Sequence, residues 1–152
     1  MSKNIKRKSD QSIGFTEEEK AAMRDRAFEI KKNSRKGKEN SDESNENEVM
    51  ESIRKMHEPD RSMAMRIHSI IMENAPSLSP RTWYGMPAYA IDDKVICFFQ
   101  NSQKFKSRYS TLGFSDRAKL DNGPMWPTSY AIMVMDVSTE ELIIDLLRRA
   151  IG

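Results

Sequence analysis

The segment TWYGMPAYA, residues Thr82 to Ala90, is the most distinctive run in the chain and decides how the region around it folds. It follows a helical region, and from here the sequence pattern has the period of two that is typical of a β-strand. Gly85 gives the backbone freedom where another group comes close, and Pro87 cannot donate a hydrogen bond to a neighbouring strand. We therefore predict one irregular strand over residues 82–90, at an edge or a bulge of a sheet.

The two faces of this predicted strand should differ. Alternation places Trp83 and Tyr89 on one face and Met86 and Ala88 on the other. The sequence predicts that Met86 and Ala88 point into the core, whereas Trp83 and Tyr89 border a cavity. A shift of one residue would exchange the two sets.

Strand signals continue downstream. Asp92 and Asp93 indicate a turn into KVICFF, so that the two strands form a hairpin. Further strands are predicted over 105–112 and 130–136. A closing amphipathic helix follows, beginning with a capping box formed by Ser138 and Glu141.

Upstream of the domain, the sequence predicts three segments. Residues 1–14 form a disordered tail, residues 15–36 an accessory helix that begins with a Thr16–Glu19 capping box, and residues 37–47, which contain no apolar residue, a linker. The domain proper spans 48–152 and opens with two helices, the second capped by Asp60. Helices followed by a block of strands and a closing helix predict an α+β fold, with a small antiparallel sheet of about four strands packed with helices.

Composition narrows the classes of protein. A length of 152 residues suits one domain, and a net charge of +2 is too small to indicate a nucleic-acid binder. No apolar run approaches the roughly 20 residues of a membrane helix, and the single cysteine, Cys97, excludes an internal disulfide. We expect a soluble, cytoplasmic protein. Cys97 lies in the middle of a predicted strand, where a thiol is usually a small buried hydrophobe and its thiolate is disfavoured.

Aromatic residues and cations supply the candidate ligand site. Aromatic walls with a few positive charges suit a small anionic or aromatic ligand, although the same rings could instead fill the core between sheet and helices. The candidate ligand-binding residues are Trp83, Tyr84, Tyr89, Lys104, Lys106, Arg108, Tyr109 and Trp126.

The sequence contains no recognisable catalytic or metal motif. It has no phosphate-binding glycine loop, no nucleophile elbow and no zinc-like spacing of Cys and His. His57 and His68 fall on different predicted helices and are interpreted as surface or interfacial residues. The acidic residues between Glu39 and Glu51 are interpreted as solvated charge, because a linker does not fix the ligand geometry that a cation requires. The sequence leaves open whether the protein is an enzyme, and it indicates no cofactor.

Three stretches carry a resemblance to a known family. APSLSPRTWYGMPAYAIDDKVICFFQ, KFKSRYSTLGFSD and MWPTSYAIM, with the closing helix, resemble the bacterial YdhG-like family of unknown function over residues 60–152. The resemblance implies a small α+β domain. Some relatives are described as frataxin-like intracellular iron chaperones, but none of their metal motifs can be placed on residues of this chain.

Two hypotheses for function follow. The first is a non-catalytic binding module for a small or anionic ligand, beside the YGMP segment at residues 84–87. The alternative, suggested by the resemblance, is an intracellular iron chaperone. The partner is expected to be an unidentified small molecule or protein rather than a nucleic acid or a membrane, and the N-terminal helix offers a route to an oligomer.

Overall fold

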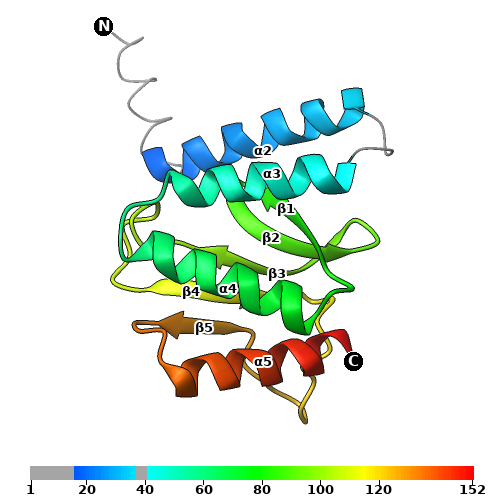
Figure 1. Ribbon diagram of the computed structural model, residues 1–152, viewed down its shortest axis with the longest axis vertical. Helices are drawn as coiled ribbons and strands as arrows, with labels where there is room; N and C mark the ends of the chain where they lie inside the picture. The colour runs from blue at the N-terminus through cyan, green and yellow to red at the C-terminus, as the bar shows by residue number, and fades with distance from the viewer. Residues whose placement is uncertain (1–15, 37–40) are drawn as a thin grey trace, which may run out of the picture.

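The computed structural model describes residues 16–36 and 41–152, with side chains for 16–26 and 43–152. In this part of the chain a five-stranded antiparallel sheet packs against helices, which confirms the predicted α+β fold (Figure 1). The predicted tail over 1–14 lies outside the described residues. The helices are α2 (Glu17–Lys36), α3 (Ser41–Arg54), α4 (Asp60–Asn74) and α5 (Val137–Ile151). The strands are β1 (Ser79–Trp83), β2 (Met86–Ile91), β3 (Lys94–Gln100), β4 (Ser110–Phe114) and β5 (Ser129–Ile132), and they lie side by side in chain order.

The segment TWYGMPAYA is a tight hairpin, so the prediction of one continuous strand is wrong. Trp83 ends β1 and pairs with Met86, the first residue of β2. The two residues between them have positive φ, 52° at Tyr84 and 74° at Gly85, as a type I′ turn requires. This turn explains why the sheet has five strands rather than about four.

Pro87 is tolerated inside the sheet because of its place in the register. It lies opposite Thr82 on β1, whereas the paired residues of β2 and β3 begin at Ala88 and Phe98. Pro87 therefore occupies a position at which β3 does not need an N–H donor. The predicted irregularity is also present, because the β2–β3 register shifts between Tyr89 and Ala90.

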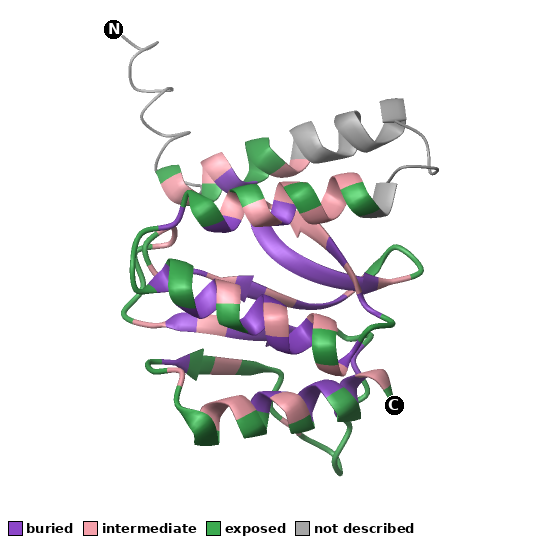
Figure 2. Ribbon diagram, in the orientation of Figure 1, coloured by how far each residue is buried: buried purple, intermediate pink, exposed green. Residues whose placement is uncertain are grey.

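The face assignment of β2 is partly wrong. Met86 and Ala88 are buried, as predicted, but Tyr89 is only 1% exposed and belongs to the main core rather than to a cavity wall. Tyr89 pairs with Cys97 on β3, and both belong to the core that includes the apolar side of α4. Both faces of β2 are thus covered, which Figure 2 shows as an almost continuous buried strand.

Large side chains cover the second face of the sheet. The rings of Trp83 and Phe98 lie 5.2 Å apart, centroid to centroid, and Phe98 pairs with Ala88 on one side and Gly113 on the other. A Cβ atom at Gly113 would collide with the ring of Phe98. The ring of Phe98 therefore occupies the space that a side chain at Gly113 would fill. On the other side of Phe98, Ala88 is fully buried.

The remaining strand predictions hold in part. Asp92 and Asp93, with φ of 51° and 64°, form the predicted turn between β2 and β3. The third predicted strand begins too early, because β4 starts at Ser110 and residues 101–109 form a loop. The last predicted strand ends too late, because β5 ends at Ile132.

The helix ends show which capping signals were correct. Thr16 and Glu19 form the predicted capping box, with Thr16 N–H donating to Glu19 Oε1 at 2.9 Å and Glu19 N–H to Thr16 Oγ1 at 3.1 Å. The predicted Ser138–Glu141 box is wrong, because Asp136 caps α5 and accepts from Thr139 N–H at 2.8 Å.

Helix α3 begins earlier than predicted. It starts at Ser41, so the predicted linker over 37–47 is wrong for residues 41–47, and residues 37–40 lie outside the described part. The apolar side of α3, Val49 and Ile53, joins the core and anchors the acidic residues that precede it. Among the described residues, no helix is both long and apolar enough to cross a membrane.

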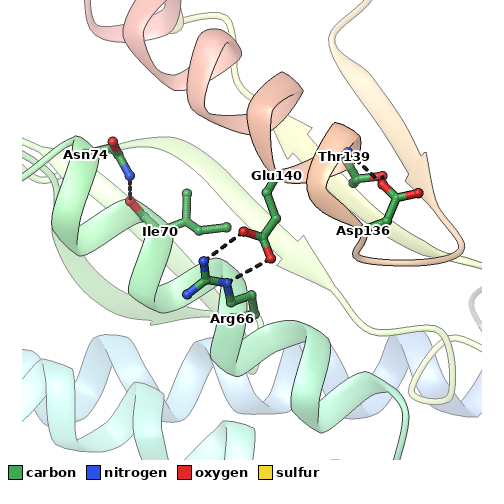
Figure 3. A network of polar contacts seen from close by, with 6 residues as sticks. All are labelled: Arg66, Ile70, Asn74, Asp136, Thr139 and Glu140. Atoms are coloured by element: carbon green, nitrogen blue, oxygen red, sulfur yellow. Dashed lines mark hydrogen bonds and ion pairs between the residues drawn. The ribbon is translucent and has the colours of Figure 1, made fainter.

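A bidentate ion pair joins α4 to α5. Arg66 donates from Nε and Nη2 to the two carboxylate oxygens of Glu140, at 2.9 Å and 2.8 Å (Figure 3). The buried side chains of Ile143, Leu146 and Leu147 on α5 belong to the same core as α4. The planar guanidinium matches the carboxylate geometry and fixes the relative position of the two helices.

A buried carboxylate joins α4 to the loop that follows β3. Asp60 is 1% exposed and does not cap α4, contrary to the prediction. Its oxygens accept hydrogen bonds from Ser102 Oγ at 2.9 Å, Gln103 N–H at 3.0 Å and Ser110 Oγ at 3.2 Å. Its place in the first turn of α4 also suits a negative charge. The beginning of α4 therefore determines the path of the chain from β3 to β4.

Replacing Asp60 should destabilise the protein strongly. Asp60→Ala leaves three donors without their acceptor, so we expect the free energy of unfolding to fall by about 2–4 kcal/mol. Chemical denaturation measures this, with Asp121→Ala, at an exposed loop position, as the matched control. Equal stability of the two variants would contradict the role given to Asp60.

Acid should weaken the link between α4 and α5. Hydrogen bonding to Arg66 lowers the pKa of Glu140 from its usual 4.5. Because the pKa is lower in the folded state, this stabilisation is present above the usual pKa and is lost as the pH falls through the folded value. As the pH falls below the usual pKa of 4.5, Glu140→Gln should therefore lose less stability than the wild type. Glu141→Gln, at the exposed neighbouring position, should keep the wild-type pH dependence, and identical acid profiles for all three proteins would refute the prediction.

Candidate functional site

A cleft of about 550 Å³ lies between α3, the β1–β2 turn and the loop after β3. Most of its lining residues are polar, and they come from segments far apart in the sequence. The lining residues are Asp25 of α2; Glu48, Glu51 and Ser52 of α3; Lys55, Met56 and His57 after α3; Thr82 of β1; Gly85 of the β1–β2 turn; and Asn101, Gln103 and Lys104 of the loop.

Asp60 holds the loop side of the cleft in place. Its hydrogen bonds to Ser102 and Gln103 hold the residues that lie between Asn101 and Lys104. Ser102 N–H also donates to Ser110 Oγ at 3.1 Å, which ties the same loop to the start of β4. A loop with this many bonds to its surroundings presents its side chains to the cleft in a fixed geometry.

Lys104 meets the β1–β2 turn at the wall of the cleft. Its ammonium donates to Tyr84 O at 3.0 Å and to Asp25 Oδ2 at 3.3 Å. A Cβ atom at Gly85 would collide with Lys104 Nζ and with Asp25 Oδ2. Residue 85 must therefore be glycine for two reasons: its φ is positive, and a side chain would occupy the space of the ion pair. The group predicted to approach Gly85 closely is Lys104.

Asn101 is the most unusual residue of the cleft wall. It is only 7% exposed, yet among the described residues its side-chain amide makes no hydrogen bond. Its amide atoms keep some exposure to solvent, so they face the open cleft rather than the core. Because Asn101 lines the cleft, its donor and acceptor are available to a molecule bound there.

The charges that line the cleft are unevenly paired. Asp25 pairs with Lys104, and Glu51 pairs with Arg54 at 3.1 Å. Within the described part of the chain, Lys55 and His57 have no ion-pair partner, and both are exposed at the rim. The groups left open to a ligand are thus mainly hydrogen-bond donors and a positive charge.

The structure disperses the residues predicted to bind a ligand, and Lys104 is the one among them that lines the cleft. Trp83 and Tyr84 contact each other at the hairpin, with ring centroids 4.9 Å apart. Lys106 pairs with Glu18 of α2 at 2.7 Å. The others are elsewhere: Tyr89 in the core, Arg108 stacked over Tyr109 at 5.2 Å in the loop, and Trp126 against the core from the β4–β5 loop.

Tyr89 instead takes part in a buried polar chain. Its hydroxyl lies 2.9 Å from His68 Nδ1, and His68 Nε2 lies 3.3 Å from Glu46 Oε2 on α3. Burial raises the pKa of Tyr89 well above its usual value, so the phenol stays protonated. This chain joins β2, α4 and α3, and it places His68 at an interface, in line with its interpretation from sequence.

Sequence reasoning missed most of the cleft. Glu48, Lys55 and Asn101 carry no motif, and Glu48 was interpreted as solvated charge beside a linker. The sequence signal that could have revealed these residues is the helical spacing of the apolar residues Val49 and Ile53. These two side chains anchor α3 in the core, and the side chains on its other faces are thereby held in place. In the described residues, no group of three or more His, Cys, Asp and Glu side chains is arranged to hold a metal ion.

Comparisons of the chain with family models, curated proteins and solved structures give no match. The resemblance to the YdhG-like family stays a prediction.

Cys97 should be chemically inert in the folded protein. It is fully buried, and burial raises the pKa of its thiol to about 12. At pH 8 only about one thiol in ten thousand would be ionised, given a pKa of about 12. A chromogenic disulfide reagent should therefore label native protein very slowly and guanidinium-unfolded protein completely. Rapid labelling under native conditions would show that β3 opens readily or that Cys97 is accessible.

Proposed function

We propose that the protein is a non-catalytic binding module, and that its ligand is a small polar molecule with an anionic group, held in the cleft beside the β1–β2 turn. The side-chain amide of Asn101, which lines the cleft and makes no hydrogen bond among the described residues, is the observation that carries this proposal. The donor and the acceptor of this amide open onto the cleft, where a ligand with a hydrogen-bonding group can bond them.

The size of the cleft supports a small molecule. About 550 Å³ lies within the usual range of ligand sites, which is about 300–1,000 Å³. Met56 provides an apolar surface among mainly polar lining residues, so the ligand is expected to combine a polar head with a modest carbon skeleton.

The pairing of charges supports an anionic group. The carboxylates of Asp25 and Glu51 already have cationic partners, whereas Lys55 has none among the described residues. An anion near Lys55 and His57 gains an ion pair with a cation that has no partner among the described residues. The three carboxylates of the wall would repel a highly charged ligand, which favours one or two negative charges.

We propose no catalytic role because neither the thiol of Cys97 nor the hydroxyl of Ser52 is arranged as an activated nucleophile. Cys97, the one cysteine of the sequence, is buried, and its pKa is raised to about 12. Ser52, which lines the cleft, donates its hydroxyl to Val49 O at 2.7 Å rather than to a base. A nucleophile needs a base that accepts its proton, and neither residue has that arrangement.

Calorimetry and thermal shift with inorganic phosphate, succinate and glycerol phosphate test the proposal. We expect at least one of these anions to stabilise the protein. Asn101→Leu should weaken its binding by about tenfold or more, because the amide can no longer bond the ligand. Asn122→Leu, at an exposed position of the β4–β5 loop, is the matched control and should bind like the wild type.

A second pair of variants separates binding from folding. Lys55 is exposed, so Lys55→Gln should leave stability unchanged and weaken the binding of anions, whereas Lys94→Gln, exposed at the β2–β3 turn, should do neither. The proposal fails if these anions leave the melting temperature of the wild type unchanged, or if Asn101→Leu and Lys55→Gln both bind with full affinity.

A further inference from the structure

The described side chains of helix α2 contact the domain mainly through charged groups. Over residues 17–26, for which its side chains are described, Ala22 is buried and Met23 is 36% exposed. The polar contacts are Glu18 with Lys106 at 2.7 Å, Asp25 with Lys104 at 3.3 Å, and the Arg26 guanidinium 5.9 Å from the centre of the Tyr84 ring. Contacts of this kind at the surface are weak and are screened by salt.

One of these contacts lies in the cleft itself. Asp25 and Lys104 both line it, and their ion pair lies against the Cα of Gly85. Lys104 Nζ is already fixed by Tyr84 O, so its remaining hydrogens have a defined direction. The place that Asp25 Oδ2 occupies is thus a prepared position for a carboxylate or phosphate oxygen at the wall of the cleft.

We infer that Lys104 is a contact for the anionic group of the ligand, and that Asp25 occupies this contact as an internal competitor until the ligand arrives. This inference rests on the proposed function of the cleft. A ligand oxygen that reaches Lys104 replaces the carboxylate of Asp25, and α2 loses one of the contacts described for residues 17–26. Ligand binding and docking of α2 are then coupled with a negative sign, and each weakens the other by the same factor.

The coupling has a structural consequence at the far side of the same loop. Lys104 and Lys106 are two residues apart, and both hold α2, through Asp25 and Glu18. Release of Asp25 leaves Glu18–Lys106 as the remaining described ion pair between α2 and this loop. The ligand would therefore loosen α2 without disturbing the core, because Asp60 holds the loop independently.

The test uses the full-length chain with inorganic phosphate and succinate as probes. Asp25→Asn removes the competing charge, so binding of the anion should tighten by about three- to tenfold. Glu17→Gln, on the same helix but outside the cleft, should bind like the wild type. Lys104→Gln should weaken binding, and adding Asp25→Asn to Lys104→Gln should tighten binding by less than Asp25→Asn does alone, because only the repulsion between Asp25 and the anion is then removed.

Hydrogen exchange of the amides in residues 17–26 supplies a second readout. Exchange should be faster in Asp25→Asn than in the wild type without any ligand, and saturating phosphate should speed it in the wild type. Anion binding that is unchanged or weaker in Asp25→Asn overturns this inference and leaves the binding module in place. Failure of every variant to bind either anion overturns both the inference and the proposed function.

Discussion

The carboxylate of Asp60 joins three segments that are distant in the sequence: the first turn of α4, the loop after β3 and the first residue of β4. A buried carboxylate without hydrogen-bond partners would be costly, so the three donors must stay within bonding distance of Asp60. This requirement fixes the positions of the segments that carry them. The loop between β3 and β4 is therefore attached to the helical layer rather than left to solvent. The crossing from β3 to β4 and one wall of the cleft depend on this contact.

Local signals in the sequence were sufficient for much of the fold. The capping box at Thr16, the turn at Asp92–Asp93 and the burial of Cys97 each depend on neighbours in the sequence, and all three are present. The turn at Tyr84–Gly85 was missed because its first residue is a tyrosine, whereas Asn or Asp is the usual residue at that position of a type I′ turn. Because this turn was missed, Tyr89 was predicted at a cavity wall rather than in the core. The predicted fold class was not affected.

The cleft could not be found in the same way. Its wall joins α2, α3, the first hairpin and the loop after β3, and the proximity of these segments follows from tertiary packing. The expected site was built from aromatic residues, but Tyr89 and Trp126 contribute to packing instead. Lys104 was anticipated as a cation near the hairpin, and Gly85 as a point of close approach, because both features are local to one stretch of chain. The position of Asn101 at the cleft wall depends on the distant Asp60, which holds its loop, and no local pattern reveals it.

The order of the strands has a consequence for how the chain folds. Every strand pairs with the strand that precedes or follows it in the sequence, and two of the four connections contain only two residues. Contacts of this kind give a low contact order, and the entropy lost on closing each loop is small. The sheet can grow one hairpin at a time from the two tight turns. Two sets of long-range contacts would then form last: those of Asp60 with the loop after β3, and those of α5 with α4. These contacts would make folding of the sheet and of the helices one cooperative transition.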